Sequence, residues 1–79
     1  MQLESIFGKV VKTLRINKKI TQEQLSIDST LDRSYISLLE NGHYQPTLTS
    51  LFDISRALRM KPSELVRLVE IEFENQRSR

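Results

Sequence analysis

Residues 21–42 decide the fold, and they read TQEQLSIDSTLDRSYISLLENG. Thr21 opens a capping-box pattern, in which a threonine and a glutamine three positions later begin a helix. Asp32 is a second helix-starting residue, and Asn41-Gly42 is a typical helix end. This stretch therefore predicts two short helices joined by a tight turn, at 21–28 and 32–41.

Apolar residues with helical spacing flank this pair on both sides. Before it, one stripe consists of Ile6, Phe7, Val10, Val11 and Leu14. After it, a helix that Thr47 caps carries Leu48, Leu51, Phe52, Ile54, Ala57 and Leu58. A last helix begins at Pro62 and extends to about residue 75. We therefore predict an all-α, five-helix domain, in which Gly8 marks a close approach of another element to the first helix.

The composition limits the classes of function. Seventy-nine residues with 38% hydrophobic content make one small domain, residues 1–79. The chain has no cysteine, one histidine and two glycines, which argues against a disulfide, a metal site and a glycine-rich phosphate loop. No apolar run approaches the roughly 18 residues that span a bilayer. We therefore expect a cytoplasmic binding module without cofactor or metal, and not an enzyme.

The net charge of +2 hides a segregation of charge along the chain. Residues 5–22 contain five basic residues and no acidic one, whereas residues 64–74 contain four glutamates and one arginine. This pattern favours one face that binds a polyanion and one that is turned away from it. The alternative is chance clustering of charge on an ordinary solvated surface.

The second helix of the pair has the side chains that reading a base sequence requires. In a helix-turn-helix this helix enters the DNA major groove, so its back is apolar and its outer side polar. Ile36 and Leu39 form the apolar back of this helix. In the segment before it, the core residues are Leu25 and either Ile27 or Leu31. The predicted outer side consists of Arg33 for guanine, Ser34 and Ser37 for bases or phosphates, and Leu38 for a thymine methyl. Tyr35 either reaches a phosphate or is a partly buried ring with its hydroxyl at the edge.

The chain resembles the Cro/phage-repressor (XRE-type) helix-turn-helix family over roughly residues 6–69. The runs that carry the resemblance are TQEQL (21–25), SYIS (34–37), LENG (39–42), QPTL (45–48) and PSEL (62–65). The run LDRSYIS (31–37) is similar in particular to the controller proteins of restriction–modification systems, which belong to bacteria. The resemblance implies a bacterial or phage DNA-binding regulator.

The resemblance also assigns roles to individual positions. Gln22 matches a glutamine that binds phosphate and braces the recognition helix, and Glu40 matches a structural glutamate. The implied base-reading positions are Asp32, Arg33, Ser34 and Leu38. Tyr35 and Ser37 match positions that reach the DNA backbone or flanking bases. For Asp32 we favour a helix cap over a contact with cytosine.

This sequence departs from the family pattern at three places. Ser29-Thr30 replaces the usual Ala-Gly, so the turn forms without the freedom of glycine at positive φ. Lys19 replaces the usual glycine before the second helix. His43 replaces the usual Lys or Arg after Asn-Gly, which weakens one expected phosphate contact.

Among the basic residues before the turn, Arg15 is the first expected phosphate contact, on a stripe with Lys12 and Lys19.

The last helix is expected to form a homodimer. Leu65, Leu68, Val69 and Phe73 make a core-type stripe, and Val66 and Ile71 lie outside it. The predicted dimer interface consists of Leu65, Val66, Val69, Ile71 and Phe73. The alternative is a helix that only completes the core of a monomer.

These observations predict a transcriptional regulator that binds a pseudo-palindromic operator as a homodimer. It excludes RNA polymerase from the promoter or, when suitably placed, contacts it. A controller protein would regulate its own gene and that of a restriction endonuclease. The alternative function is an antitoxin-type or phage repressor module whose main partner is another protein, since exposed Val66 and Ile71 would serve that partner equally well.

Overall fold

The computed structural model describes residues 2–77, so the ends of the expected domain at residues 1, 78 and 79 lie outside the described residues. The described part contains five helices and no strand, which confirms the all-α fold. Their bounds are α1 Leu3–Asn17, α2 Gln22–Ser29, α3 Arg33–Glu40, α4 Leu48–Ala57 and α5 Pro62–Arg77. Within residues 2–77, no helix combines the length and the apolar character that crossing a membrane requires.

The helices begin where the local sequence predicts. The hydroxyl of Thr21 accepts a hydrogen bond from the amide of Gln24 at 3.0 Å, but the Gln24 side chain donates to Asp28 instead of completing a capping box. Thr47 caps α4 in the same way, at 3.0 Å from the amide of Ser50. Asp32 occupies the N-cap position of α3, yet its side chain makes no capping hydrogen bond, so that part of the prediction is wrong.

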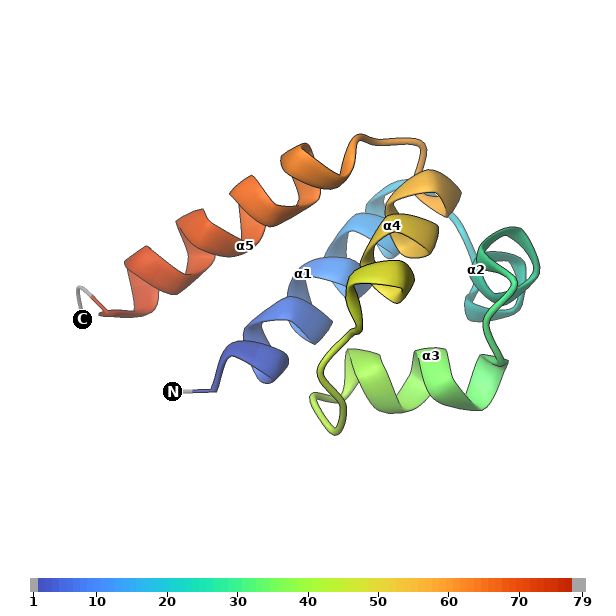
Figure 1. Ribbon diagram of the computed structural model, residues 1–79, viewed down its shortest axis with the longest axis horizontal. Helices are drawn as coiled ribbons and strands as arrows, with labels where there is room; N and C mark the ends of the chain where they lie inside the picture. Colours follow the sequence, from blue (N-terminus) through green and yellow to red (C-terminus); the bar gives the residue numbers. More distant parts are fainter. Residues whose placement is uncertain (1, 78–79) are drawn as a thin grey trace.

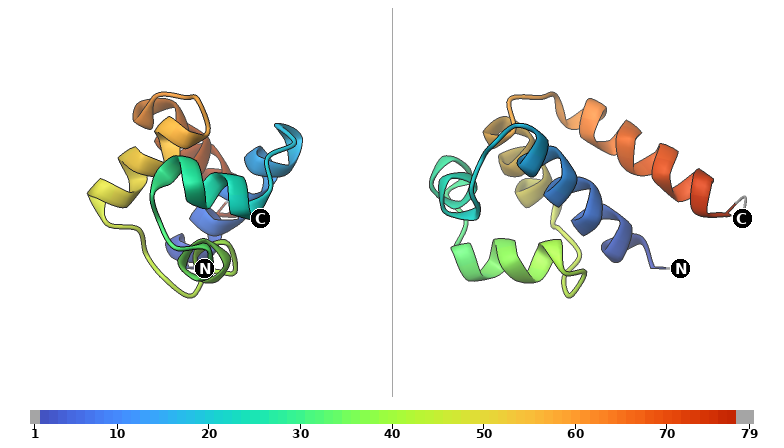
Figure 2. Two further views of the ribbon diagram at one scale, coloured as in Figure 1. Left: turned by 90° about the vertical axis from the view of Figure 1, so that its right-hand side faces the viewer. Right: turned by 180° about the vertical axis from the view of Figure 1, so that it is seen from behind.

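The five helices form a closed ring of contacts. α1 packs against α3 and α5, α2 packs against α3 and α4, and α4 packs against α5. α3 and α5 therefore lie on opposite sides of α1 (Figures 1 and 2). The buried apolar residues are Ile6, Phe7, Val11, Leu25, Ile36, Leu39, Ile54, Ala57, Leu58, Leu65 and Val69. Leu31 packs against this core as expected, whereas Ile27 is 61% exposed and does not belong to it.

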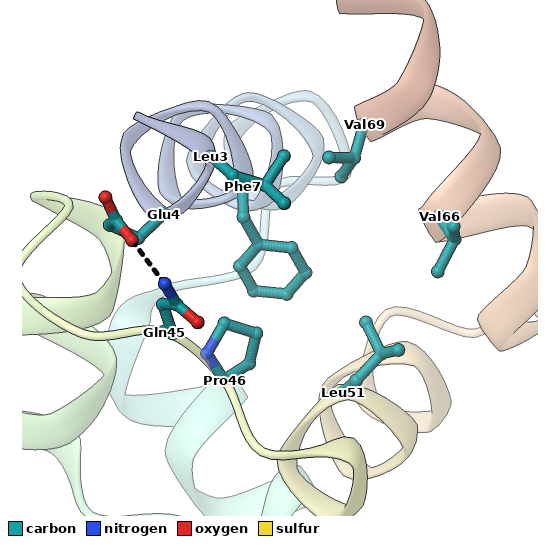
Figure 3. Close-up of a pocket in the computed structure, with 8 residues that line it drawn as sticks. All are labelled: Leu3, Glu4, Phe7, Gln45, Pro46, Leu51, Val66 and Val69. Carbon is teal, nitrogen blue, oxygen red and sulfur yellow. Dashed lines mark hydrogen bonds between the residues drawn. The ribbon is translucent and has the colours of Figure 1, made fainter. Parts of the chain in front are cut away.

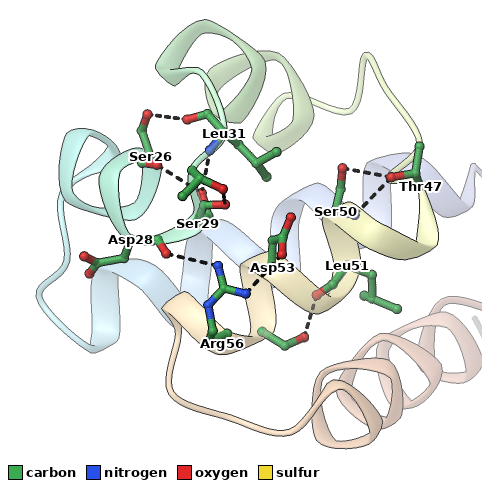
Figure 4. A network of polar contacts seen from close by, with 11 residues as sticks. Ser26, Asp28, Ser29, Leu31, Thr47, Ser50, Leu51, Asp53 and Arg56 are labelled. Carbon is green, nitrogen blue, oxygen red and sulfur yellow. Dashed lines mark hydrogen bonds and ion pairs between the residues drawn. The ribbon is translucent and has the colours of Figure 1, made fainter.

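The turn between α2 and α3 forms without glycine. Thr30 adopts a left-handed conformation with φ of 60°, which costs a residue with a side chain about 1–2 kcal/mol. Three serine-mediated hydrogen bonds offset this cost (Figure 4). Ser26 donates to the carbonyl of Leu31, Ser29 donates to the carbonyl of Ser26, and the amide of Leu31 donates to Ser29. These side chains therefore add to the backbone hydrogen bonds of the turn, in which the amides of Thr30 and Leu31 donate to the carbonyls of Ile27 and Ser26.

Gly8 is the point of closest approach between α1 and α3. A Cβ atom at this position would lie 2.2 Å from the carbonyl oxygen of Leu39 and 2.9 Å from that of Glu40. Because these are backbone atoms, α1 would have to move away from α3. The close packing that the glycine predicted is confirmed.

Gly8→Ala is expected to lower the free energy of unfolding by about 3 kcal/mol, at the upper end of overpacking effects, despite the better helix propensity of alanine. Urea denaturation followed by circular dichroism measures the loss. Thr13→Ala, at an exposed position of the same helix, is the matched control and should leave stability unchanged or slightly raised. Equal stability of the two variants would contradict the close approach.

Candidate nucleic-acid interface

The outer side of α3 is exposed and polar. Asp32, Arg33, Ser34 and Leu38 are exposed, and we call these four residues the α3 face. The opposite side of the helix is anchored in the core, where Ile36 and Leu39 are fully buried. α3 lies along one edge of the molecule (Figure 1). Ser37 and Tyr35, by contrast, are half-buried.

A buried ion pair fixes the end of α3 to α1. The guanidinium of Arg15 donates to both carboxylate oxygens of Glu40, at 2.7 and 3.1 Å, and to the carbonyl of Ile20 at 2.9 Å. The two side chains are only 11% and 1% exposed. The amide of Gln22 donates to the same carboxylate at 3.0 Å. One carboxylate thus ties α1, α2 and α3 together, which confirms the structural role of Glu40 and the bracing role of Gln22.

The prediction that Arg15 contacts a phosphate is wrong. Its guanidinium is committed to Glu40 and to the Ile20 carbonyl, and little of it reaches solvent. The expected stripe of basic residues does not form either. α1 ends at Asn17, and Lys19 adopts a left-handed conformation with φ of 59° beyond that end. Lys12 and Lys19 remain exposed, but Lys19 lies beyond the end of the helix that carries Lys12 and Arg15.

Tyr35 is held by two neighbours. Its hydroxyl lies 3.4 Å from the hydroxyl of Ser50 at the start of α4. Its ring stacks on that of Tyr44, with 5.7 Å between the centroids and an interplanar angle of 18°. Of the two predictions for Tyr35, a phosphate contact or a partly buried ring with its hydroxyl at the edge, this arrangement corresponds to the partly buried ring. Tyr44 could not be predicted from the sequence, because no spacing rule connects an aromatic residue in a loop to a residue nine positions earlier.

The loop that follows α3 is attached to the start of α1. The amide side chain of Gln45 donates to Glu4 at 2.7 Å (Figure 3). Gly42, with φ of 81°, is close enough to Ser5 that a Cβ atom would lie 2.8 Å from its hydroxyl. His43 is exposed, and its backbone amide donates to Leu38 at 2.9 Å. Within residues 2–77, no three His, Asp or Glu side chains gather as a metal site would require.

The predicted dimer interface needs correction as well. Leu65 is 0% exposed and Val69 is buried, because both complete the core of the chain itself. Phe73 is half-buried against the same core. Only Val66 and Ile71 of the predicted set are exposed. Neither residue lies in the core-type stripe, so that stripe is not a surface on which a second copy could dock.

Most of the exposed apolar surface near α5 lies on the side of α4. Leu3, Leu48, Phe52 and Val66 are exposed there, and we call these residues the α4–α5 face. An apolar cleft of about 230 Å³ opens within it (Figure 3). Its lining consists of Leu3, Glu4, Phe7, Gln45, Pro46, Leu51, Val66 and Val69.

A second apolar cleft lies on the other side of α5. Between α1 and α5 it is lined by Val10, Leu14, Leu68 and Ile71, with Lys9, Thr13 and Glu72 also in the lining. Lys9 and Glu72 lie 3.9 Å apart. We call this surface the α1–α5 cleft. α5 therefore carries apolar residues on three sides, and only one of these sides is used by the core.

Comparison with known proteins identifies the family. The chain is 39% identical over 67 residues to the control protein C.MunI of Mycoplasma sp., covering 84% of this chain and 90% of that protein. It is 36% identical over 62 residues to the control protein C.BamHI of Bacillus amyloliquefaciens, covering 77% and 76%. The structure matches that of the restriction–modification controller protein C.Esp1396I, described as a tetramer in complex with its natural 35 base-pair operator. That match has a TM-score of 0.84 and 33% identity, and it covers 91% of this chain and 95% of that chain.

The model of the family described as HTH_3, helix-turn-helix, matches residues 11–65, which include the whole of α2, α3 and α4. This range contains the α3 face, the turn with Thr30 and the Arg15–Glu40 pair. The chain belongs to this XRE-type helix-turn-helix family of transcription regulators.

Proposed function

We propose that the chain is a single DNA-binding domain that reads a two-fold symmetric operator as a homodimer and so controls transcription. The observation that carries this proposal is the α3 face, because a helix anchored by its apolar side presents Arg33 and Ser34 to the major groove. Asp32 and Leu38 complete the outer side. Gln22, Tyr35, Ser37 and His43 then lie beside the DNA backbone.

The partner in the proposed dimer is a second copy docked on the α4–α5 face. The apolar cleft there continues into a groove lined by Leu48, Phe52 and Val66, together with Arg67 and Glu70. Neither Arg67 nor Glu70 forms an ion pair within residues 2–77. A two-fold interface brings the same surface of two copies together. A surface with both a positive and a negative residue can then pair Arg67 of one copy with Glu70 of the other.

Control is exerted by occupancy of the operator. A dimer that places its two recognition helices about 34 Å apart reaches successive turns of the major groove. When bound over a promoter it excludes RNA polymerase, and when bound beside one it can contact it. By similarity to C.BamHI and C.MunI, we propose a controller role, in which the chain regulates its own gene and that of a restriction endonuclease.

Selection from a randomised pool of DNA duplexes at about 100 mM salt tests this function directly. We expect enrichment of an inverted repeat whose half-sites lie about one helical turn apart. Binding without enrichment would leave a protein that recognises only the DNA backbone. Absence of binding would indicate that the chain acts by binding another protein, as an antitoxin does. The α1–α5 cleft would then be the surface to examine.

Arg33→Ala is expected to weaken binding to the selected operator and to relax the preference at one base pair of each half-site. A bidentate contact with guanine contributes about 1–3 kcal/mol of discrimination. Competition binding against single-base operator variants measures both effects. Arg77→Ala, which removes the same charge at the far end of α5, is the matched control and should retain the base preference. An unchanged preference in Arg33→Ala would contradict the assigned contact.

A further inference from the structure

Tyr44 is an exposed aromatic residue next to the recognition helix that the proposed contacts with DNA do not use. It is 47% exposed, and one face of its ring lies against Tyr35 in the first turn of α3. Because this turn also carries Arg33 and Ser34, the stack lies directly beside the residues proposed to read bases. A Tyr–Tyr stack of this kind fixes the relative orientation of the two rings.

The segment that carries Tyr44 is held by α1 as well as by the end of α3, where the amides of Gly42 and His43 donate to the carbonyls of Leu39 and Leu38 at 3.1 and 2.9 Å. On the side following Tyr44, the Gln45 side chain is bonded to Glu4 of α1 at 2.7 Å. On the side preceding it, Gly42 packs closely on Ser5 of the same helix. The backbone on both sides of Tyr44 is therefore fixed, and the stack connects it to the first turn of α3.

Tyr35 is fixed from a second direction by α4. Its hydroxyl lies 3.4 Å from that of Ser50, which in turn accepts a hydrogen bond from the hydroxyl of Thr47 at 2.9 Å. The ring thus has a polar anchor at its tip and an aromatic anchor on its face. Removal of Tyr44 would leave the hydroxyl contact with Ser50 and the packing against the core to orient Tyr35, with nothing stacked on the face of its ring.

We propose that Tyr44 is a positioning residue for base recognition: by stacking on Tyr35 it fixes the first turn of α3 relative to the loop that lies against the DNA backbone. This inference rests on the proposed function of the α3 face. The ring of Tyr44 performs this role, and its hydroxyl is dispensable. Tyr44 therefore contributes to the choice between base sequences more than to attraction for DNA in general.

The test compares Tyr44→Ala with Tyr44→Phe in binding to the selected operator, to operators with one altered base pair, and to unrelated duplex DNA. We expect Tyr44→Ala to reduce the ratio of operator to altered-operator affinity about 3- to 10-fold, in the range of an aromatic pair. Affinity for unrelated DNA should change less than twofold in the same variant. Tyr44→Phe should retain the wild-type ratio within about twofold, because its ring still stacks.

A double-mutant cycle with Tyr35→Leu separates positioning from direct contact. If Tyr44 acts through Tyr35, its replacement by alanine should have little further effect in the Tyr35→Leu background. Ile16→Ala, at an exposed position of α1, is the control for a general effect of removing an exposed apolar side chain. Thermal unfolding of each variant verifies that the fold is retained.

Three results would overturn the inference. Tyr44→Phe could lose as much discrimination as Tyr44→Ala, which would assign the role to the hydroxyl. Tyr44→Ala could lower affinity for all DNA equally, which would make Tyr44 a backbone contact. The effects of Tyr35→Leu and Tyr44→Ala could be additive, which would remove the coupling. Failure of the wild-type chain to select any operator is a different result and contradicts the proposed function itself.

Discussion

Arg15→Met is expected to lower the free energy of unfolding by about 3–5 kcal/mol, because it leaves the carboxylate of Glu40 buried without its cation. The Glu40 side chain is 1% exposed, so solvent cannot replace the lost partner. Only the amide of Gln22 would still donate to it. For a domain of this size such a loss is a large part of the total stability.

Urea denaturation at neutral pH measures this loss, and two further variants define its origin. Arg77→Met breaks an exposed pair with Glu74 and should cost less than about 1 kcal/mol. The double variant Arg15→Met/Glu40→Met should recover much of the lost stability, since two apolar side chains can fill the site without an isolated charge. Equal, small losses in Arg15→Met and Arg77→Met would show that the buried pair does not hold α1 and α3 together.

Phe52→Glu is expected to convert the proposed dimer into a folded monomer and to weaken operator binding at least 100-fold. The charge would be placed in the α4–α5 face, where docking of a second copy must exclude water. The loss in DNA affinity follows because a dimer binds its second half-site as an intramolecular event, which raises affinity by about 10²–10⁴. Since Phe52 is 53% exposed, the fold of the single chain should persist.

Light scattering after size-exclusion chromatography measures the oligomeric state, and gel-shift titration measures operator affinity. Ile71→Glu introduces the same charge into the α1–α5 cleft, on the other side of α5, and should remain dimeric. If Ile71→Glu is monomeric and Phe52→Glu is dimeric, the second copy docks on the α1–α5 cleft. If both variants are dimeric, neither surface is the interface.

Local signals in the sequence predicted the helices well, because helix ends depend on near neighbours. Thr21 and Thr47 cap their helices with their own hydroxyls, and Asn41-Gly42 follows the end of α3. Gly8 predicted a close approach because few other reasons place glycine inside an apolar helical stripe. These features need only a few residues of context.

Apart from the missing capping bonds of Asp32 and Gln24, the main differences concern contacts between distant parts of the chain. Arg15 has the same spacing whether it binds a phosphate or a carboxylate 25 positions away. The last helix has apolar residues on three sides, and periodicity alone cannot say that Leu65 belongs to the core while Val66 belongs to the surface. Of the two candidates to join Leu25 in the core, Leu31 packs against it and Ile27 is exposed, and residue spacing alone does not choose between them.

The recognition helix is divided into an inner side that holds it and an outer side that meets solvent. Ile36, Leu39, Glu40 and Tyr35 attach it to the other helices, whereas Arg33 and Ser34 are exposed. Mutations on the outer side can therefore accumulate without weakening the scaffold. Related regulators with the same two-sided helix can keep one fold and bind different promoters. New target sequences can evolve by exchange of a few surface residues.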